Sequence, residues 1–284
     1  MAVNAGGEME GSIGGGIMEH KFVELAKAQL RKNAQLTEIR RQIHDKQVAV
    51  NQSGMICSGE QNIFLYRVQA TDETPIQQII QCITQQQNGA LRLSPGGIAF
   101  SDAPPAQDFR FHQTTEEDWQ YEEKLGYQHH LHIIGAGHCS LALSKLMNTL
   151  DFYIHLYDNR NDLNTFAQNS FAHEKTIIRD YTELTELITA GDHQYIVIMT
   201  FGYRTDYTAA KALLGKQYRY MGIMGSQKKI ATLFEDMIAE GIAPAVLQSI
   251  HAPIGLPIKS ETPEEIAVSI AAEIIAAKNN ATRR

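Results

Sequence analysis

Short runs of consecutive apolar residues alternate with amphipathic stretches over the second half of this 284-residue chain. The runs lie at 130–134, 152–157, 175–178, 194–200 and 218–224. The core of each run is a short continuous apolar stretch, such as Tyr195-Ile196-Val197-Ile198-Met199, whereas the residues of a half-exposed strand would alternate. Strands that are covered on both faces require this pattern. It predicts an α/β fold in which residues 129–284 form a Rossmann-like, doubly wound parallel sheet.

The first hundred residues follow a different pattern. A helical apolar face predicts a helix over 17–32, strand-like segments lie at 38–43 and 63–69, and a second helix is expected over 75–87. This mixture predicts a smaller N-terminal α+β domain over residues 1–100. Residues 101–128 contain two prolines and then an acidic run of weak periodicity, so we expect a linker there.

The first strand of the second half leads directly into a glycine turn, Gly135-Ala136-Gly137-His138-Cys139-Ser140, which precedes a helix-like segment. In a strand–turn–helix unit the first glycine permits the turn, and the second lets a ligand approach the backbone. The free N–H groups and the dipole of the following helix favour an anion. The turn therefore predicts a phosphate site. Ser140 stands where the dinucleotide-binding fingerprint has its third glycine, so that match is incomplete.

An acid follows at the spacing that a dinucleotide site requires. Asp158 ends the second strand, 23 residues after Gly135, close to the interval expected for a ribose-binding carboxylate. Arg160 either meets a phosphate or is exposed to solvent. These residues make NAD(P) a candidate cofactor and an NAD(P)-dependent oxidoreductase an alternative function. No general acid or base for hydride transfer stands out.

Other strand ends point to the same edge of the sheet. Thr200 follows the fourth strand, and Gly225 and Ser226 follow the fifth. Ligands of open α/β sheets bind at the carboxyl ends of the strands, so we expect these residues to converge with Gly137 and Asp158 on one crevice. Ser226 is also a good N-cap residue, and capping is compatible with either role.

Several residues have two interpretations. Cys139 is either a thiol activated by the helix start or a small packed residue, and His138 either binds an anion or metal or does neither. Cys57 is either a metal contact or an inert thiol. The cluster Gly14-Gly15-Gly16 either presents N–H groups to an anion or forms a tight turn. Cys139 and Cys57 are thus the candidate metal contacts.

The composition narrows the class of protein. With a formal net charge of -7, the chain has no excess of positive charge that would attract nucleic acid or an anionic membrane. No run of about 18 apolar residues exists, and no basic-then-apolar leader opens the chain. The three cysteines lie far apart and are odd in number, which argues against a disulfide framework. We expect a cytoplasmic protein.

Four segments together resemble the XdhC/CoxI family of accessory proteins for molybdenum hydroxylases such as xanthine dehydrogenase. They are Gly11-Ser12-Ile13-Gly14-Gly15-Gly16-Ile17-Met18-Glu19, Ile134-Gly135-Ala136-Gly137-His138 with Asp158 and Arg160, Gly222-Ile223-Met224-Gly225-Ser226 with Lys229, and Pro253-Ile254-Gly255-Leu256 with the helix from Thr262 to Ile274. The similarity covers nearly the whole chain, and the last segment is the most specific.

The resemblance implies a maturation chaperone rather than a catalyst. Family members bind the molybdenum cofactor, protect it and hand it to an apo-hydroxylase, and a cysteine desulfurase supplies sulfur. It further implies a homodimer. Molybdopterin carries a phosphate, which suits the glycine turn as well as NAD(P) does. The expected cofactor-binding residues are Gly14, Gly15, Gly16, Gly135, Gly137, His138, Cys139, Asp158, Arg160, Thr200, Gly225 and Ser226.

The chain departs from the family pattern in three places. Family members carry strands before the glycine cluster, including a Gly-Ser-x-Pro-Arg segment, so we expect a shortened N-terminal domain. Phe201 stands where many members have histidine, and Ser58 replaces a glycine that often follows the Cys57 position.

Overall fold

The computed structural model divides the chain into two compact units, Met1–Gly126 and Tyr127–Arg284. The structure describes all residues except 33–36, 44–59, 86, 116, 127–128 and 280–284. The two units are described separately below.

The second unit is built on a five-stranded sheet whose strands are all parallel. The strand order is β11-β10-β9-β12-β13. The strands are β9 (His129–Ile134), β10 (Phe152–Asp158), β11 (Glu174–Ile177), β12 (Gly191–Ile198) and β13 (Tyr218–Ile223). In the central register Ile133 lies between Leu156 and Val197. The predicted doubly wound parallel sheet is confirmed.

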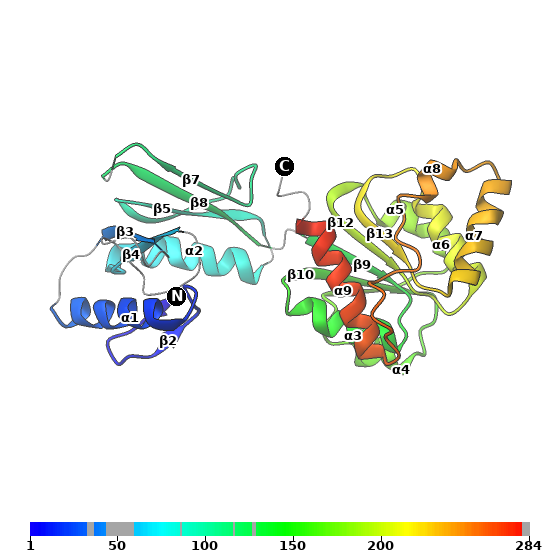
Figure 1. Ribbon diagram of the computed structural model, residues 1–284, viewed down its shortest axis with the longest axis horizontal. Helices are drawn as coiled ribbons and strands as arrows, with labels where there is room; N and C mark the ends of the chain where they lie inside the picture. Colours follow the sequence, from blue (N-terminus) through cyan, green and yellow to red (C-terminus); the bar gives the residue numbers. More distant parts are fainter. Residues whose placement is uncertain (33–36, 44–59, 86, 116, 127–128, 280–284) are drawn as a thin grey trace. The chain divides into compact units, whose positions relative to one another are not determined.

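Helices cover both faces of this sheet, as the continuously apolar strands require. They are α3 (His138–Asn148), α4 (Asn164–Gln168), α5 (Leu184–Leu187), α6 (Tyr203–Leu213), α7 (Gln227–Ala239), α8 (Pro244–Leu247) and α9 (Pro263–Asn279), with a 3-10 turn at Tyr181–Glu183. Figure 1 shows α3 and α9 on one side of the sheet and α6, α7 and α8 on the other. Neighbouring residues of one strand enter different cores: Ile133 packs with residues of α3 and α9, and Ile134 with residues of α6 and α7.

The segment after α8 extends the sheet beyond β13. His251 forms a parallel bridge with Gly222, and the N–H of Ile254 donates to the carbonyl of Ile223 at 3.0 Å. The chain then turns into α9, where Thr262 and Glu265 form the reciprocal cap that the sequence indicates, with bonds of 3.0 and 3.2 Å. The apolar stripe of α9 packs against α3.

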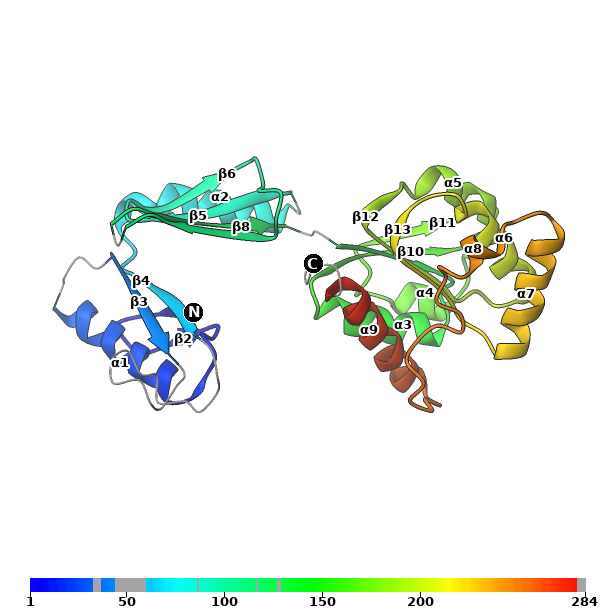
Figure 2. The same cartoon turned by 45° about the horizontal axis from the view of Figure 1, so that its top comes forward.

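The first unit is a mixture of small antiparallel sheets and two helices. The strands are β1 (Ala2–Val3), β2 (Met9–Glu10), β3 (Thr37–Ile43), β4 (Glu60–Tyr66), β5 (Gly89–Ser94), β6 (Gly97–Ser101), β7 (Phe109–Gln113) and β8 (Trp119–Leu125). The helices are α1 (Gly16–Arg31) and α2 (Glu73–Thr84), with a 3-10 turn at Ala70–Asp72. Four strands form a sheet of order β6-β5-β8-β7, against which α2 packs (Figure 2).

The prediction of a linker over 101–128 is wrong for most of that segment. Strands β7 and β8 occupy it and complete the sheet of the first unit. Its acidic residues resembled a solvated connection, but Glu122 is buried and lies between Arg92 and Arg110 of the two neighbouring strands. Trp119 is also buried. The first unit therefore extends to Gly126 rather than ending near residue 100.

Candidate functional site

The glycine turn after β9 lies directly against the end of β12. Gly135 has a φ of +105°, and a Cβ placed there would lie 2.4 Å from the carbonyl oxygen of Met199 and 2.8 Å from Cα of Thr200. Only glycine combines this backbone conformation with such a close approach. The N–H of Gly135 donates to the carbonyl of Tyr157 at 2.7 Å, and the Ser140 hydroxyl donates to the carbonyl of Gly135. The turn is thus held by β10, β12 and α3.

The start of α3 offers donors to an anion. Gly137 is the N-cap, and no described side chain caps the helix. A Cβ built on Gly137 meets no heavy atom of the described chain within 4 Å, so the space beside it is open. The first N–H groups of a helix lack intrahelical acceptors, and the helix dipole adds a partial positive charge. These features are those of a phosphate-binding turn.

Asp158 supports the glycine turn through hydrogen bonds and is fully buried. One carboxylate oxygen accepts the N–H of Ala136 at 2.7 Å and Nη2 of Arg160 at 2.8 Å. The other accepts the N–H and Nε of Arg160 at 3.0 and 2.9 Å. Burial raises the pKa of Asp158, but these hydrogen bonds outweigh it and leave the pKa below its ordinary value. The side chain is therefore an ionised, fully bonded support of the turn.

Arg160 lies between this carboxylate and an aromatic ring. Its guanidinium carbon is 4.5 Å from the centroid of the Phe201 ring, which is 62% exposed. The guanidinium is thus held by the two-point contact with Asp158 and covered by Phe201. Sequence reasoning placed Arg160 at the site but treated Phe201 only as a departure from the family pattern.

Thr200 is tied to a buried ion pair. Its N–H and its hydroxyl donate to the same carboxylate oxygen of Asp206, at 3.0 and 2.6 Å, and its Oγ1 lies 2.5 Å from that of Thr205. The other oxygen of Asp206 accepts Nζ of Lys229. Asp206 is fully buried on α6, so this pair connects the end of β12 to the start of α7.

Gly225 and Ser226 determine the position of Lys229 at the start of α7. The Ser226 hydroxyl accepts the N–H of Lys229 at 3.2 Å and caps α7, as the sequence predicts. A Cβ on Gly225 would lie 2.9 Å from Cδ of Lys229. Asp206 is the residue that sequence reasoning missed here. Its signal is weak, since an aspartate in the first turn of a helix is also explained by the helix dipole.

The thiol candidates do not form a metal site in the described part of the chain. Burial raises the pKa of the Cys139 thiol and the carboxylate of Glu264 raises it further, so of the two interpretations the small packed residue is favoured over the activated thiol. His138 is exposed at the first position of α3. Cys57 lies outside the described residues. Within those residues no group of three or more His, Cys, Asp or Glu side chains is arranged to hold a metal.

The N-terminal glycine cluster already encloses a carboxylate of its own chain. One oxygen of Glu19 accepts the Ser12 hydroxyl at 2.6 Å, the N–H of Ile13 at 2.9 Å and the N–H of Gly15 at 3.1 Å. Gly14 to Gly16 all have positive φ, which the loop requires in order to wrap around this oxygen. The cluster therefore does present N–H groups to an anion, but that anion is the side chain of α1.

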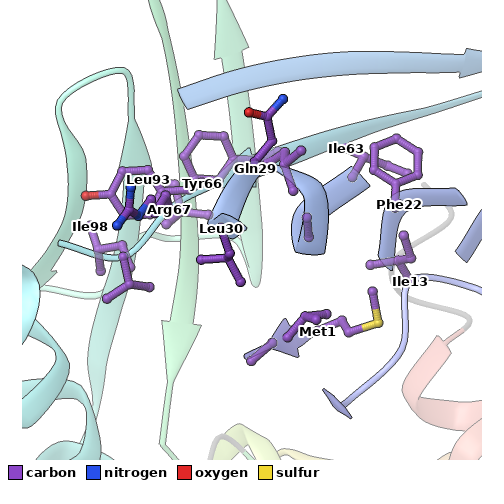
Figure 3. A pocket seen from close by; sticks show the side chains of 16 residues that line it. Met1, Ile13, Phe22, Gln29, Leu30, Ile63, Tyr66, Arg67, Leu93 and Ile98 are labelled. Carbon is purple, nitrogen blue, oxygen red and sulfur yellow. The ribbon is translucent and has the colours of Figure 1, made fainter. Parts of the chain in front are cut away.

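A cavity of about 440 Å³ lies in the first unit (Figure 3). Ile13 and Phe22 lie at one end and Leu93 and Ile98 at the other, and most of its lining is apolar. None of the predicted cofactor-binding residues lines it. It is a separate feature from the glycine turn of the second unit.

A histidine network lies on the α5–α6 face of the parallel sheet, and sequence reasoning did not predict it. Nδ1 of His130 is 3.0 Å from Nε2 of His155, and Nδ1 of His155 is 3.0 Å from Glu174. His132 stacks on His155 with ring centroids 4.5 Å apart. Burial lowers the pKa of all three histidines. The side chains alternate along β9 and β10, a signal that was present in the sequence.

The comparisons with known proteins settle the family. Residues 131–274 match the sequence profile of the XdhC Rossmann domain. The chain belongs to this family. No described helix is long and apolar enough to cross a membrane.

The XdhC chain is similar to two curated proteins over somewhat more than half its length. It is 30% identical over 159 residues to the uncharacterized protein YqeB of Escherichia coli K12, covering 55% of this chain and 28% of that protein. It is 28% identical over 166 residues to a probable xanthine dehydrogenase subunit of Bacillus subtilis 168, covering 58% and 47%. The matched region thus spans less than half of either relative.

A solved structure shares the fold. The crystal structure of a xanthine dehydrogenase from Bacillus halodurans superposes with a TM-score of 0.72 and 22% identity, covering 99% of this chain and 86% of that one. The similarity extends the shared fold over both units.

Proposed function

We propose that this XdhC protein binds the molybdenum cofactor and delivers it to a xanthine dehydrogenase-type apo-enzyme, acting as a maturation chaperone rather than as a catalyst. Membership of the XdhC family supports an accessory role, and the similarity to the probable xanthine dehydrogenase subunit of Bacillus subtilis supports the class of client. A cysteine desulfurase as sulfur donor and a homodimeric state belong to the same proposal.

The residues of the glycine turn fit the phosphate of molybdopterin. The uncapped start of α3 and the open space at Gly137 are the observation that carries the proposal. The Arg160 guanidinium lies at the same edge of the sheet, where it forms an ion pair with Asp158. The bound cofactor supplies the redox centre of the client enzyme. The residues of this chain hold its phosphate through N–H groups and a helix dipole, and need no catalytic group of their own.

The bonding of Asp158 favours this ligand over NAD(P). A ribose-binding acid has to accept hydroxyl groups of the sugar. Each oxygen of Asp158 already accepts two N–H groups of the chain, and the carboxylate is fully buried. An NAD(P)-dependent oxidoreductase therefore stays the alternative with less support.

Gel filtration of the full chain with molybdenum cofactor tests the proposal. The wild type is expected to retain both pterin and molybdenum, and Gly137→Asp to lose them, because its carboxylate would occupy the anion position. Gly137→Ala is the matched control: a methyl group fits the open space and adds no charge. Aspartate is a good N-cap residue, so the charged variant should fold. Failure of the wild type to retain either component would overturn the proposal.

A further inference from the structure

Phe201 is a large apolar side chain that the fold leaves in solvent. It follows Thr200 at the end of β12, and 62% of its surface is exposed. The guanidinium of Arg160 lies over the ring, 4.5 Å from its centroid. The contact with Arg160 accounts for one face of the ring, and the exposed fraction leaves area for a second planar partner.

The ring rests on a rigid support. Arg160 is held at two points by the buried carboxylate of Asp158, through Nε at 2.9 Å and Nη2 at 2.8 Å. An arginine with a bidentate carboxylate partner is held in a defined orientation, and a guanidinium group is a favourable neighbour for an aromatic face. Phe201 therefore has a positioned cationic partner over its ring, although most of its side chain is exposed.

The same contacts join this surface to the glycine turn. Asp158 accepts the N–H of Ala136 inside the turn at 2.7 Å. Gly135 packs so closely on β12 that an added Cβ would lie 2.8 Å from Cα of Thr200, the neighbour of Phe201. A ligand whose phosphate lies at the start of α3 therefore has an aromatic side chain one residue beyond Thr200, against which the binding turn packs.

We propose that Phe201, backed by Arg160, is a stacking platform for the planar heterocycle of a phosphorylated ligand. This inference rests on the proposed function, in which that heterocycle is the pterin of the molybdenum cofactor. Arg160 fixes the platform from behind, and the glycine turn holds the phosphate. The ligand class is a phosphate ester of a flat, nitrogen-containing ring system.

Binding of molybdenum cofactor, released from a purified molybdenum hydroxylase, to variants of the full chain tests the platform. Loss of one stacking contact weakens binding of a heterocycle by roughly 5- to 150-fold, and Phe201→Ala is expected to fall in this range. Phe201→Trp keeps an aromatic ring and should bind the cofactor about as tightly as the wild type. The emission of the new indole should be quenched when the pterin binds. Phe111→Ala removes an exposed ring of the first unit and should leave the affinity unchanged.

The outcomes separate the platform from the proposed function. If the wild type binds the cofactor and Phe201→Ala binds it equally well, the platform is overturned and the function stands. If the wild type binds no cofactor, titration with NADH is the second arm. Tight NADH binding that depends on Phe201 upholds the platform and overturns the function, and binding of neither ligand overturns both.

Discussion

Lys229 at the start of α7 forms an ion pair with Asp206 of α6, whose carboxylate is fully buried. The second oxygen of that carboxylate accepts the hydroxyl and the N–H of Thr200. Two helices and the end of β12 are therefore held by one buried charge. Since Lys229 is the cation on that charge, its removal would leave the carboxylate with the neutral donors of Thr200 alone.

Lys229→Met should destabilise the second unit strongly. Removing one partner of a buried ion pair typically costs about 3–5 kcal/mol, because the remaining charge stays buried without compensation. Hydrogen–deuterium exchange of peptides from α6 and α7 measures the effect within this unit. Lys228→Met, one residue earlier and exposed, is the matched control and should change little. Equal protection in both variants would show that Lys229 does not stabilise the carboxylate.

Gly135 and Gly137 should respond very differently to alanine. Gly135→Ala combines a φ of +105° with a Cβ 2.4 Å from the carbonyl oxygen of Met199, so we expect a loss of about 3 kcal/mol in the free energy of unfolding. Gly137 has a φ of −78° and open space beside it, and its alanine variant should be nearly as stable as the wild type. Urea denaturation followed by circular dichroism compares the two. Similar midpoints would contradict the close packing of the turn on β12.

The stability of the second unit should fall as the pH falls below 6.5. A histidine in an unfolded chain has a pKa near 6.5, whereas burial lowers the pKa of His132 to about 3. Between these values the unfolded chain binds a proton that the folded chain does not. Each pH unit in this window therefore removes about 1.4 kcal/mol, and the stabilisation is complete only above pH 6.5.

Urea denaturation at pH 7, 6 and 5 measures this slope. His130 and His155, whose pKa values burial also lowers, should add to it. His132→Phe keeps a ring stacked on His155 and should reduce the slope. A His132→Phe slope equal to that of the wild type would show that His132 does not carry the effect.

The sequence predicts the second unit better than the first, and the reason is physical. The core of strand 194–200 is buried on both faces, so its apolar run from Tyr195 to Met199 is continuous and unambiguous. The strands of the first unit are partly exposed, and Glu122 resembled a solvated residue because its partners, Arg92 and Arg110, lie on other strands.

At the candidate site, too, the sequence predicts local features but not the partners that tertiary contacts bring together. The turn, its acid and the strand ends follow from local spacing, and in the structure Gly135 lies against Thr200 while Asp158 accepts the N–H of Ala136 inside the turn. The partners of these residues are set by tertiary contacts. No local pattern indicates that Asp206 reaches Lys229, or that Glu19 fills the N-terminal glycine loop.

Replacing Glu122 and replacing its two arginine partners should lower the stability of the first unit by different amounts. The Glu122 side chain is 5% exposed, whereas those of Arg92 and Arg110 are 41% and 62% exposed. After Glu122→Leu the two guanidinium groups can return to water, so we expect a cost below about 1.5 kcal/mol. The double variant Arg92→Met with Arg110→Met instead leaves the buried carboxylate without a cationic partner. It should lower the free energy of unfolding by about 3–5 kcal/mol.

Trp119 makes this comparison specific to the first unit. It is the single tryptophan of the chain and is buried on β8, three residues before Glu122, so its emission reports unfolding of this sheet.

The ion cluster should also make the stability of the first unit depend on pH. Burial raises the pKa of Glu122, but the two arginines outweigh this effect and leave the pKa lowered. The cluster should therefore stabilise the fold above pH 4.5 and lose this effect as the pH falls further. Glu122→Leu should remove that dependence. A double arginine variant as stable as Glu122→Leu would mean that the carboxylate is hydrated rather than buried.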